Sequence, residues 1–171
     1  MGMDVIGVRP RGEVGEYFRN NIWWWHPLWQ YCNQIAPRIC APCEGSTNDG
    51  DGLTAARAEA LAELLERSIQ DGRCQRHLEE FRAWQEAISK EPCRWCGATG
   101  VRRDDVGVQQ GMDTKVLDAE DVERLGRSTG WCNGCSGTGT TDPTGRWYGF
   151  STENVESFVA FLRHCGGFRI W

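Results

Sequence analysis

The amino-acid sequence predicts an α+β fold, in which a small helical domain carries short strands at its ends and a cysteine-rich insert. Three observations lead to this prediction: a β-prone run near each end, several segments with apolar residues at helical spacing, and two cysteine pairs flanking a polar stretch. A chain of 171 residues can bury roughly 70% of its unfolded surface around a core of its own. We therefore expect a single domain, 1–171, made of an N-terminal strand and helical part (1–92), the insert (93–140) and a C-terminal helix-strand unit (141–171).

A β-prone run near the amino terminus is expected to form the first strand. It covers residues 3–8, ends at the turn-forming residues 9–12, and can pair with the run 168–171 at the other end of the chain. The following segment carries apolar residues at helical spacing, namely Phe18, Ile22, Trp25, Trp29, Cys32 and Ala36. Because proline removes a helical hydrogen bond, we expect Pro27 either to kink this helix or to start a new one that stops before Pro37.

Two further helices are predicted after a loop at 37–52, which is rich in Pro, Gly, Asn and Asp. The first opens at Leu53 or Thr54 and closes at 71–72, and the second covers 73–90. Their apolar stripes are Ala58, Leu61, Leu64 or Leu65, and Ile69 in the first, and Leu78, Phe81, Trp84 and Ile88 in the second. The short break between them favours a helical hairpin.

The remaining segments are a polar insert and a C-terminal helix. Residues 101–129 are polar and contain glycine, with a short helix expected at 119–125. Near the end of the chain, Ser151 or Thr152 can cap a helix that stops at 166–167, before the terminal strand. The apolar residues of this helix are Val155, Phe158, Phe161 and Leu162.

The chain contains two near copies of one cysteine motif, at 93–100 and 132–139. Two residues between the cysteines allow a tight turn to aim both sulfurs at one ion, and two such turns supply the four thiolates of a tetrahedral zinc site. The predicted ligands are Cys93, Cys96, Cys132 and Cys135. Since four protein ligands leave no open position for water or substrate, we expect the zinc ion to be structural.

The motif resembles the Cys-x-x-Cys-x-Gly-x-Gly repeats in the cysteine-rich region of DnaJ-type chaperones, where paired motifs bind zinc. Residues 132–139 match the pattern fully, whereas 93–100 carries Gly97-Ala98 where the pattern has any residue followed by Gly. That region has four motifs and two zinc ions, while this chain has two motifs and no His-Pro-Asp tripeptide. The resemblance covers about a quarter of the chain and implies a DnaJ-like or zinc-ribbon-like zinc module without co-chaperone activity.

The chain as a whole resembles a group of small proteins encoded by phages and prophages. The similar stretches are 1–7 with 15–25, 130–135, and 153–168, the last through Glu153-Asn-Val, Phe161-Leu-Arg and Gly166-Gly-Phe. This resemblance implies an accessory role for a phage and supplies no catalytic residues.

Composition narrows the classes of function. With 24 acidic against 19 basic residues, the net charge of −5 argues against a large face that binds phosphates without regard to sequence. Neither a signal peptide nor a run of eighteen apolar residues occurs, so we expect a protein of the bacterial host's cytoplasm with no membrane partner. The paired spacing of the nine cysteines favours reduced thiolates over disulfides.

A second metal site is a weaker alternative. Cys40 and Cys43 form a third pair, and Cys74 with His77 offers a Cys-x-x-His partner, so these four residues could bind another zinc ion. The competing interpretation makes Cys40 and Cys43 loop thiols and places His77 on a helix surface.

Tryptophan and arginine side chains supply the candidate partner-binding residues. Trp23, Trp24 and Trp25 cannot all point one way on a helix, so we expect one or two to be buried and at least one to lie near the surface. In the zinc module, Arg94, Trp95 and Trp131 could contact a partner. A nucleic-acid-binding module is the alternative, with phosphate and stacking contacts from Arg94, Trp95, Arg102, Arg103, Arg124, Arg127 and Trp131.

No catalytic constellation is evident. The three histidines are widely spaced, and none has a Ser or acidic residue in a recognisable triad context. We therefore expect a non-enzymatic, zinc-stabilised phage accessory protein that binds a host macromolecule, with inhibition of a defence system as its purpose.

Overall fold

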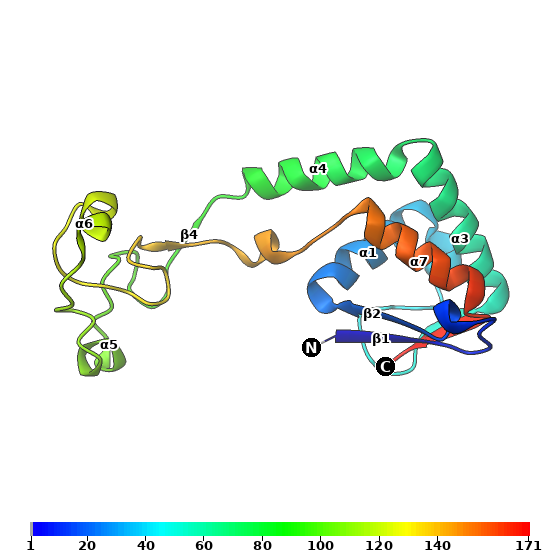
Figure 1. The fold of residues 1–171 in the computed structure, drawn as a ribbon, viewed down its shortest axis with the longest axis horizontal. Coiled ribbons are helices and arrows are strands. Elements are labelled where there is room, and N and C mark those ends of the chain that lie inside the picture. Colours follow the sequence, from blue (N-terminus) through cyan, green and yellow to red (C-terminus); the bar gives the residue numbers. More distant parts are fainter. Residues whose placement is uncertain (1) are drawn as a thin grey trace. The chain divides into compact units, whose positions relative to one another are not determined.

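The computed structural model describes residues 2–171, which divide into two compact units. Unit 1 consists of residues 2–85 together with Trp147–Trp171, and unit 2 is Glu86–Arg146 (Figure 1). Unit 2 thus contains the cysteine-rich segment and a few residues on either side of it. The mixture of helices and strands agrees with the predicted α+β class. None of the helices in residues 2–171 has both the length and the apolar character needed to cross a bilayer.

Unit 1 is built on a four-stranded antiparallel sheet in the order β2-β1-β6-β3. The strands are β1 (Gly2–Gly7), β2 (Tyr17–Asn21), β3 (Gly52–Thr54) and β6 (Gly167–Ile170). The predicted pairing of the two chain ends is confirmed, since Val5 lies opposite Ile170. Strands β2 and β3 were not predicted. Phe18 sits in β2, yet its ring still reaches Phe158 and Phe161 in the core, which explains why its position fitted a helical stripe.

Helix α1 (Ile22–Ile35) continues through Pro27, so no new helix starts there. Asn21 caps it by accepting a hydrogen bond from the Trp24 N–H. Proline cannot donate to the carbonyl four residues earlier, here that of Trp23. That carbonyl accepts instead from the Gly149 N–H at 3.0 Å, a long-range contact that compensates the lost helical bond.

The other helices of unit 1 follow the predicted boundaries closely. Helices α3 (Ala55–Gln70) and α4 (Arg73–Ala87) form the predicted hairpin, and α7 (Thr152–His164) is capped by Ser151. The segment predicted as a loop contains one additional short helix, α2 (Pro37–Cys40), whose first residue is proline as is typical of helix starts.

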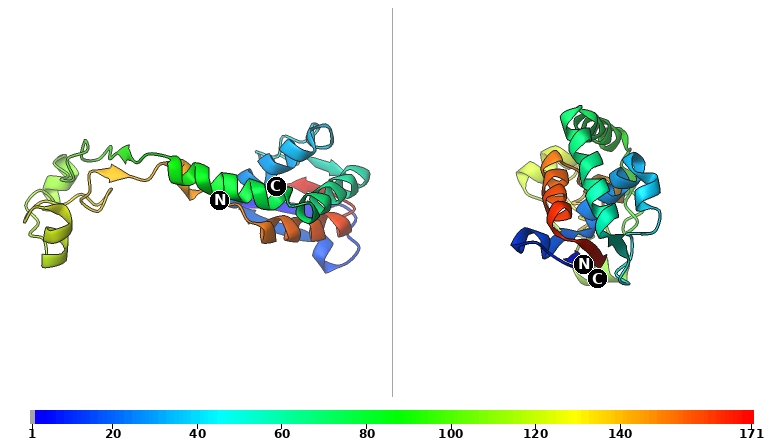
Figure 2. Two further views of the ribbon diagram at one scale, coloured as in Figure 1. Left: turned by 90° about the horizontal axis from the view of Figure 1, so that it is seen from above. Right: turned by 90° about the vertical axis from the view of Figure 1, so that its right-hand side faces the viewer.

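Helices α1, α3 and α7 cover one face of the sheet (Figures 1 and 2). Between them and the inward-facing strand residues lies one hydrophobic core. Its largest fully buried side chains are Trp25, Tyr31, Phe158, Phe161, Phe168, Leu28, Leu53, Leu61, Leu65, Leu162, Ile170 and Val5. At the edge of the core, Arg163 of α7 pairs with Glu59 and Glu66 of α3.

Unit 2 has little regular structure. It contains the two-residue strands β4 (Glu91–Pro92) and β5 (Thr140–Thr141), which pair, and the helices α5 (Asp105–Gln109) and α6 (Ala119–Leu125). Helix α6 confirms the helix expected at 119–125. Two short 3-10 helices complete the list of elements: η1 (Glu13–Gly15) lies between β1 and β2 in the chain, and η2 (Thr144–Trp147) lies between β5 and α7.

Candidate metal centre

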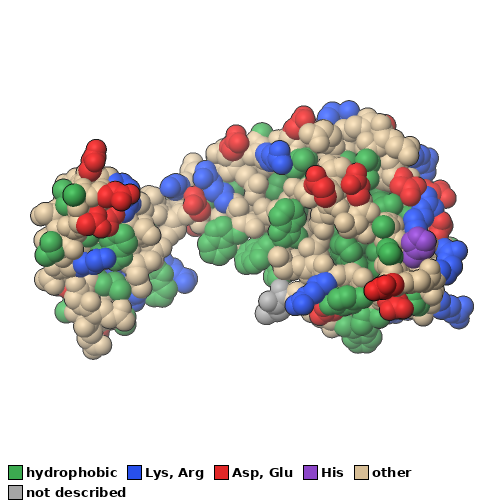
Figure 3. All heavy atoms as spheres, viewed as in Figure 1, with side chains coloured by type: hydrophobic (Ala, Val, Ile, Leu, Met, Phe, Trp, Pro, Cys, Tyr) green, Lys and Arg blue, Asp and Glu red, His purple; other side chains and the backbone are tan. Residues whose placement is uncertain are grey.

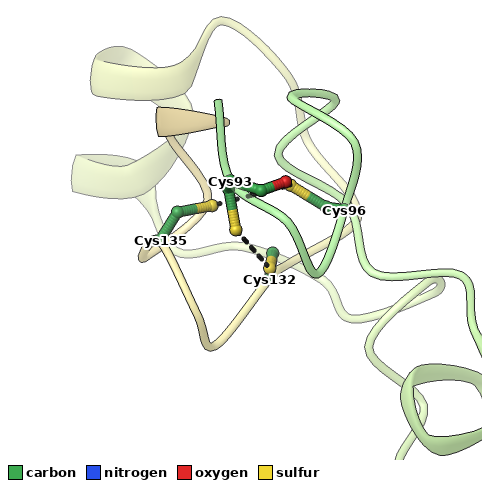
Figure 4. A group of neighbouring side chains, drawn as sticks. All are labelled: Cys93, Cys96, Cys132 and Cys135. Atoms are coloured by element: carbon green, nitrogen blue, oxygen red, sulfur yellow. Dashed lines mark hydrogen bonds between the residues drawn. The ribbon is translucent and has the colours of Figure 1, made fainter. Parts of the chain in front are cut away.

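Four cysteine side chains converge at the centre of unit 2 (Figure 4). The sulfur atoms of Cys93, Cys96, Cys132 and Cys135 all lie within 4.8 Å of one another, and all four residues are buried. The Sγ atoms of Cys93 and Cys132 are 3.9 Å apart, and those of Cys96 and Cys135 are 3.8 Å apart. A disulfide needs about 2.05 Å, so these are free thiols. The four predicted ligands are thus brought together.

The two cysteine motifs form turns with the same hydrogen bonds. The Gly100 N–H donates to the Cys96 sulfur at 3.2 Å, and the Gly139 N–H donates to the Cys135 sulfur at the same distance. The hydroxyl of the threonine three residues after each second cysteine donates to that cysteine's carbonyl, at 2.6 Å from Thr99 and 2.7 Å from Thr138. Each turn therefore directs a backbone N–H at a sulfur atom, which stabilises the thiolate form.

Both turns need two consecutive residues in the left-handed region, and this explains the mismatch between the motifs. In the first turn these residues are Gly97 and Ala98, with φ of 56° and 66°; in the second they are Ser136 and Gly137, with φ of 49° and 78°. Each turn thus has one glycine and one non-glycine residue, in opposite order. Since non-glycine residues rarely adopt this conformation, the contacts of each turn must offset the steric cost.

The two turns interlock through glycine. A side chain at Gly139 would place its Cβ 2.3 Å from the Ala98 carbonyl oxygen, and one at Gly100 would lie 2.2 Å from that of Gly137. The Cys93 N–H donates to the Gly139 carbonyl at 2.8 Å. These close approaches exclude any side chain at Gly100 or Gly139.

Arg127, which lies between the motifs in sequence, ties the two turns together. Its Nη2 atom donates to the carbonyl oxygens of Gly100, at 2.9 Å, and Gly137, at 2.6 Å. Arg127 is one of the residues predicted for the alternative nucleic-acid-binding surface, and here it is engaged within the unit. A third, longer bond joins its Nε to the Gly130 carbonyl at 3.4 Å.

Burial and backbone hydrogen bonds have opposite effects on the four thiols. Burial raises the pKa of the Cys132 thiol to about 12 and also raises the pKa of Cys135. At Cys93 burial acts in the same direction, but hydrogen bonds from the backbone N–H groups of Trp95 and Cys96, together with those of the Cys96 and Cys135 side chains, outweigh it and lower the pKa. Four adjacent thiolates repel one another, and a divalent cation removes that repulsion. The arrangement can therefore hold one metal ion.

Two tryptophans flank the metal centre, each with cationic neighbours. The guanidinium groups of Arg94 and Arg102 lie 4.7 and 4.8 Å from the centre of the Trp95 ring, and Lys115 lies 4.4 Å from that of Trp131. Trp95 is 45% exposed.

Intramolecular contacts engage several arginines of the predicted nucleic-acid surface. Arg102 is buried, forms a two-pronged ion pair with Asp104 and bonds to Asn133. Arg124 pairs with Asp121, and Arg127 is bound to carbonyls as described above. Arg94, Arg103 and Arg124 are the exposed arginines of that set, and of these Arg124 is the one held in an ion pair.

The second metal site suggested by the sequence does not form. Within residues 2–171, Cys40, Cys43, Cys74 and His77 do not converge as the first four cysteines do. Burial in the core of unit 1 raises the pKa of both Cys40 and Cys43 to about 12. The His77 ring packs 4.7 Å from those of Tyr31 and Phe150. Core packing, rather than metal binding, accounts for the three cysteines.

The tryptophan triplet divides as expected between core and surface. Trp25 is fully buried and donates to the Gly45 carbonyl, so it cannot contact a partner. Trp24 is 37% exposed and its ring lies against Gly149. A Cβ atom added at Gly149 would be 2.5 Å from the Trp24 ring. Trp23 is half-buried and stacks edge-on against Tyr148. Trp23 and Trp24 thus hold the segment that leads into α7.

The roles of Arg127 and of the two threonines were not predicted from the sequence. The role of the threonines could have been predicted, because Thr99 and Thr138 occupy the same position in the two motifs. The role of Arg127 could not have been predicted, since its partners are backbone carbonyls, which every residue has.

No protein-family model matches the chain, and no curated protein or solved structure is significantly similar to it.

Proposed function

We propose that the four-cysteine cluster binds one zinc ion and that the ion is structural. Zn–S bonds of about 2.3 Å in a tetrahedron place the sulfur atoms about 3.8 Å apart. The two S–S distances of 3.9 and 3.8 Å fit that geometry. Four thiolates complete the coordination shell, so no position remains where water or a substrate could be activated.

The resulting function is binding, and the exposed Trp95 is the observation that carries it. Tryptophan and arginine dominate the energetics of protein interfaces. Trp95 presents a rigid aromatic surface beside the exposed Arg94, on a turn that the metal ion would fix. Together with the resemblance to phage and prophage proteins, this supports a phage accessory protein that binds a host protein, with a component of a defence system as the proposed partner.

Elemental analysis of the purified chain tests the metal. We expect one zinc ion per chain in the wild type and none in Cys132→Ser/Cys135→Ser. The matched control, Cys40→Ser/Cys43→Ser, removes a Cys-x-x-Cys pair outside the cluster and should retain the zinc ion. A folded wild-type preparation without metal would refute the proposal, as would zinc retained after loss of Cys132 and Cys135.

The binding function is tested with the full chain as bait in lysate of the bacterial host, followed by affinity measurement on the purified partner. Truncating a central interface tryptophan costs about 2 kcal/mol, or roughly 30-fold in Kd. We expect this loss for Trp95→Ala, with its zinc content unchanged, and no loss for Trp171→Ala, which removes a tryptophan of similar exposure from unit 1. Unchanged affinity of Trp95→Ala, or capture of nucleic acid with steep salt dependence, contradicts the proposal.

A further inference from the structure

Unit 1 contains a groove of about 460 Å³ that none of the functions considered above uses. It is lined by α1 through His26 and Gln30, by α4 through His77, Phe81 and Trp84, and by Tyr148. Hydrophobic side chains reach the surface beside α4 in Figure 3. The volume is in the range of small-molecule sites.

The walls of the groove are aromatic rings. His26 and Tyr148 stack with ring centres 6.1 Å apart and planes 25° apart. Phe81 and Trp84 lie 5.6 Å apart on α4, and Trp84 is 50% exposed. The Gln85 side chain donates to the Tyr148 carbonyl at 2.7 Å, which fixes that residue against α4. Rings of this kind stack on flat aromatic ligands such as nucleobases.

The groove also has unused hydrogen-bonding groups. Within residues 2–171, the ring nitrogens of His26 and His77 and the Gln30 amide have no hydrogen-bond partner. Burial lowers the pKa of His77, so its ring is neutral at neutral pH and offers one donor and one acceptor. The lining contains neither Asp, Glu, Lys nor Arg. These features fit an uncharged heterocycle with donors and acceptors on its edge.

A second hollow, of about 170 Å³, adjoins the groove and shares His77 with it. Arg73, Arg76 and Glu80 line this hollow. Arg73 is paired with Asp71, whereas Arg76 has no ion-pair partner within the described part of the chain. A guanidinium group binds phosphate, and a carboxylate binds ribose hydroxyls in nucleotide sites.

We propose that unit 1 binds a free nucleoside monophosphate, with the base in the aromatic groove, the ribose near Glu80 and the phosphate at Arg76. Arg76, which has no ion-pair partner in the described residues, can bind one phosphate group. The negative charge of Glu80, which lines the same hollow, disfavours a longer phosphate chain. A free nucleotide is favoured over a nucleic-acid strand because the only other basic side chain that lines the two hollows, that of Arg73, is paired with Asp71.

Isothermal titration of the full chain with AMP, GMP, CMP and UMP, and with the matching nucleosides, tests this assignment. We expect saturable binding of at least one monophosphate, tighter than its nucleoside by about tenfold. Trp84→Ala should weaken both ligands, because both use the aromatic groove. Arg76→Glu should weaken the monophosphate alone, to the level of the nucleoside.

Two matched variants and two opposing outcomes make the test decisive. Trp171→Ala and Arg19→Glu change an exposed tryptophan and an exposed arginine elsewhere in unit 1 and should bind as the wild type does. Absence of saturable binding up to about 1 mM ligand overturns the proposal. Equal affinity for nucleoside and monophosphate, or tighter binding of a short oligonucleotide, overturns the assignment of a free nucleotide with its phosphate at Arg76.

Discussion

Replacing Arg127 should weaken zinc binding although Arg127 is not a ligand. Its guanidinium group joins the two cysteine turns through the carbonyls of Gly100 and Gly137, at 2.9 and 2.6 Å. Hydrogen bonds from a charged donor contribute about 1.5–3 kcal/mol each, but Arg127 is only half-buried and water can replace part of each bond. We therefore take about 1 kcal/mol for each of the two short bonds and nothing for the longer one to Gly130.

The sum of about 2 kcal/mol corresponds to a zinc affinity roughly 30-fold lower in Arg127→Ala, because metal binding and the folding of such a unit are coupled. Competition against a chromophoric chelator at fixed pH and salt measures this change. Arg127→Lys keeps the positive charge but loses the planar set of N–H donors of the guanidinium group. Its zinc affinity should lie between those of the wild type and Arg127→Ala. Arg103→Ala removes an exposed arginine of the same unit and serves as the control. If Arg127→Ala binds zinc as tightly as Arg103→Ala does, the inferred link between the turns is wrong.

Three further predictions concern the turns, the core and the independence of the units. Ala98→Gly should raise zinc affinity about twofold in the same competition, because glycine adopts the left-handed conformation without steric cost; a lower affinity contradicts this. The hydrogen bond from Arg163 lowers the pKa of Glu66 below its ordinary value of 4.5. The ionised Glu66 therefore stabilises the folded state above about pH 4.5, and this stabilisation is lost as the pH falls below that value. Urea unfolding at neutral and acidic pH measures the free energy of unfolding. Between the two pH values it should fall less for Glu66→Gln than for the wild type, and an equal decrease refutes the inference. Zinc chelation should remove hydrogen-exchange protection from unit 2 and leave it in α3 and α7, because those helices have their own core; loss of protection in both helices would show that the metal organises the whole chain.

Features that depend on neighbouring residues could be predicted from the sequence. The spacing of apolar side chains located α3, α4 and α7, since a helix repeats every few residues and closes its hydrogen bonds locally. The two Cys-x-x-Cys motifs identified the four cysteines that meet, because a two-residue spacing fixes how each turn aims its sulfurs.

Features that depend on contacts between distant residues were decided by the tertiary structure. Helix α1 continues through Pro27 because Gly149, far away in sequence, supplies the donor for the Trp23 carbonyl. Phe18 belongs to a strand because β1 offers it a partner, although its apolar character suits a helix equally well.

The same distinction applies to the functional residues. Cys40 and Cys43 have the same spacing as the metal-site pairs, but the fold buries them in the core of unit 1 without a second pair opposite. Arg127 joins the two cysteine turns through backbone carbonyls, which cannot be recognised in a pattern of side chains. The sequence by itself determined the local turns and helices of this protein; which of them meet depends on packing between residues far apart in the chain, and that only the tertiary structure decided.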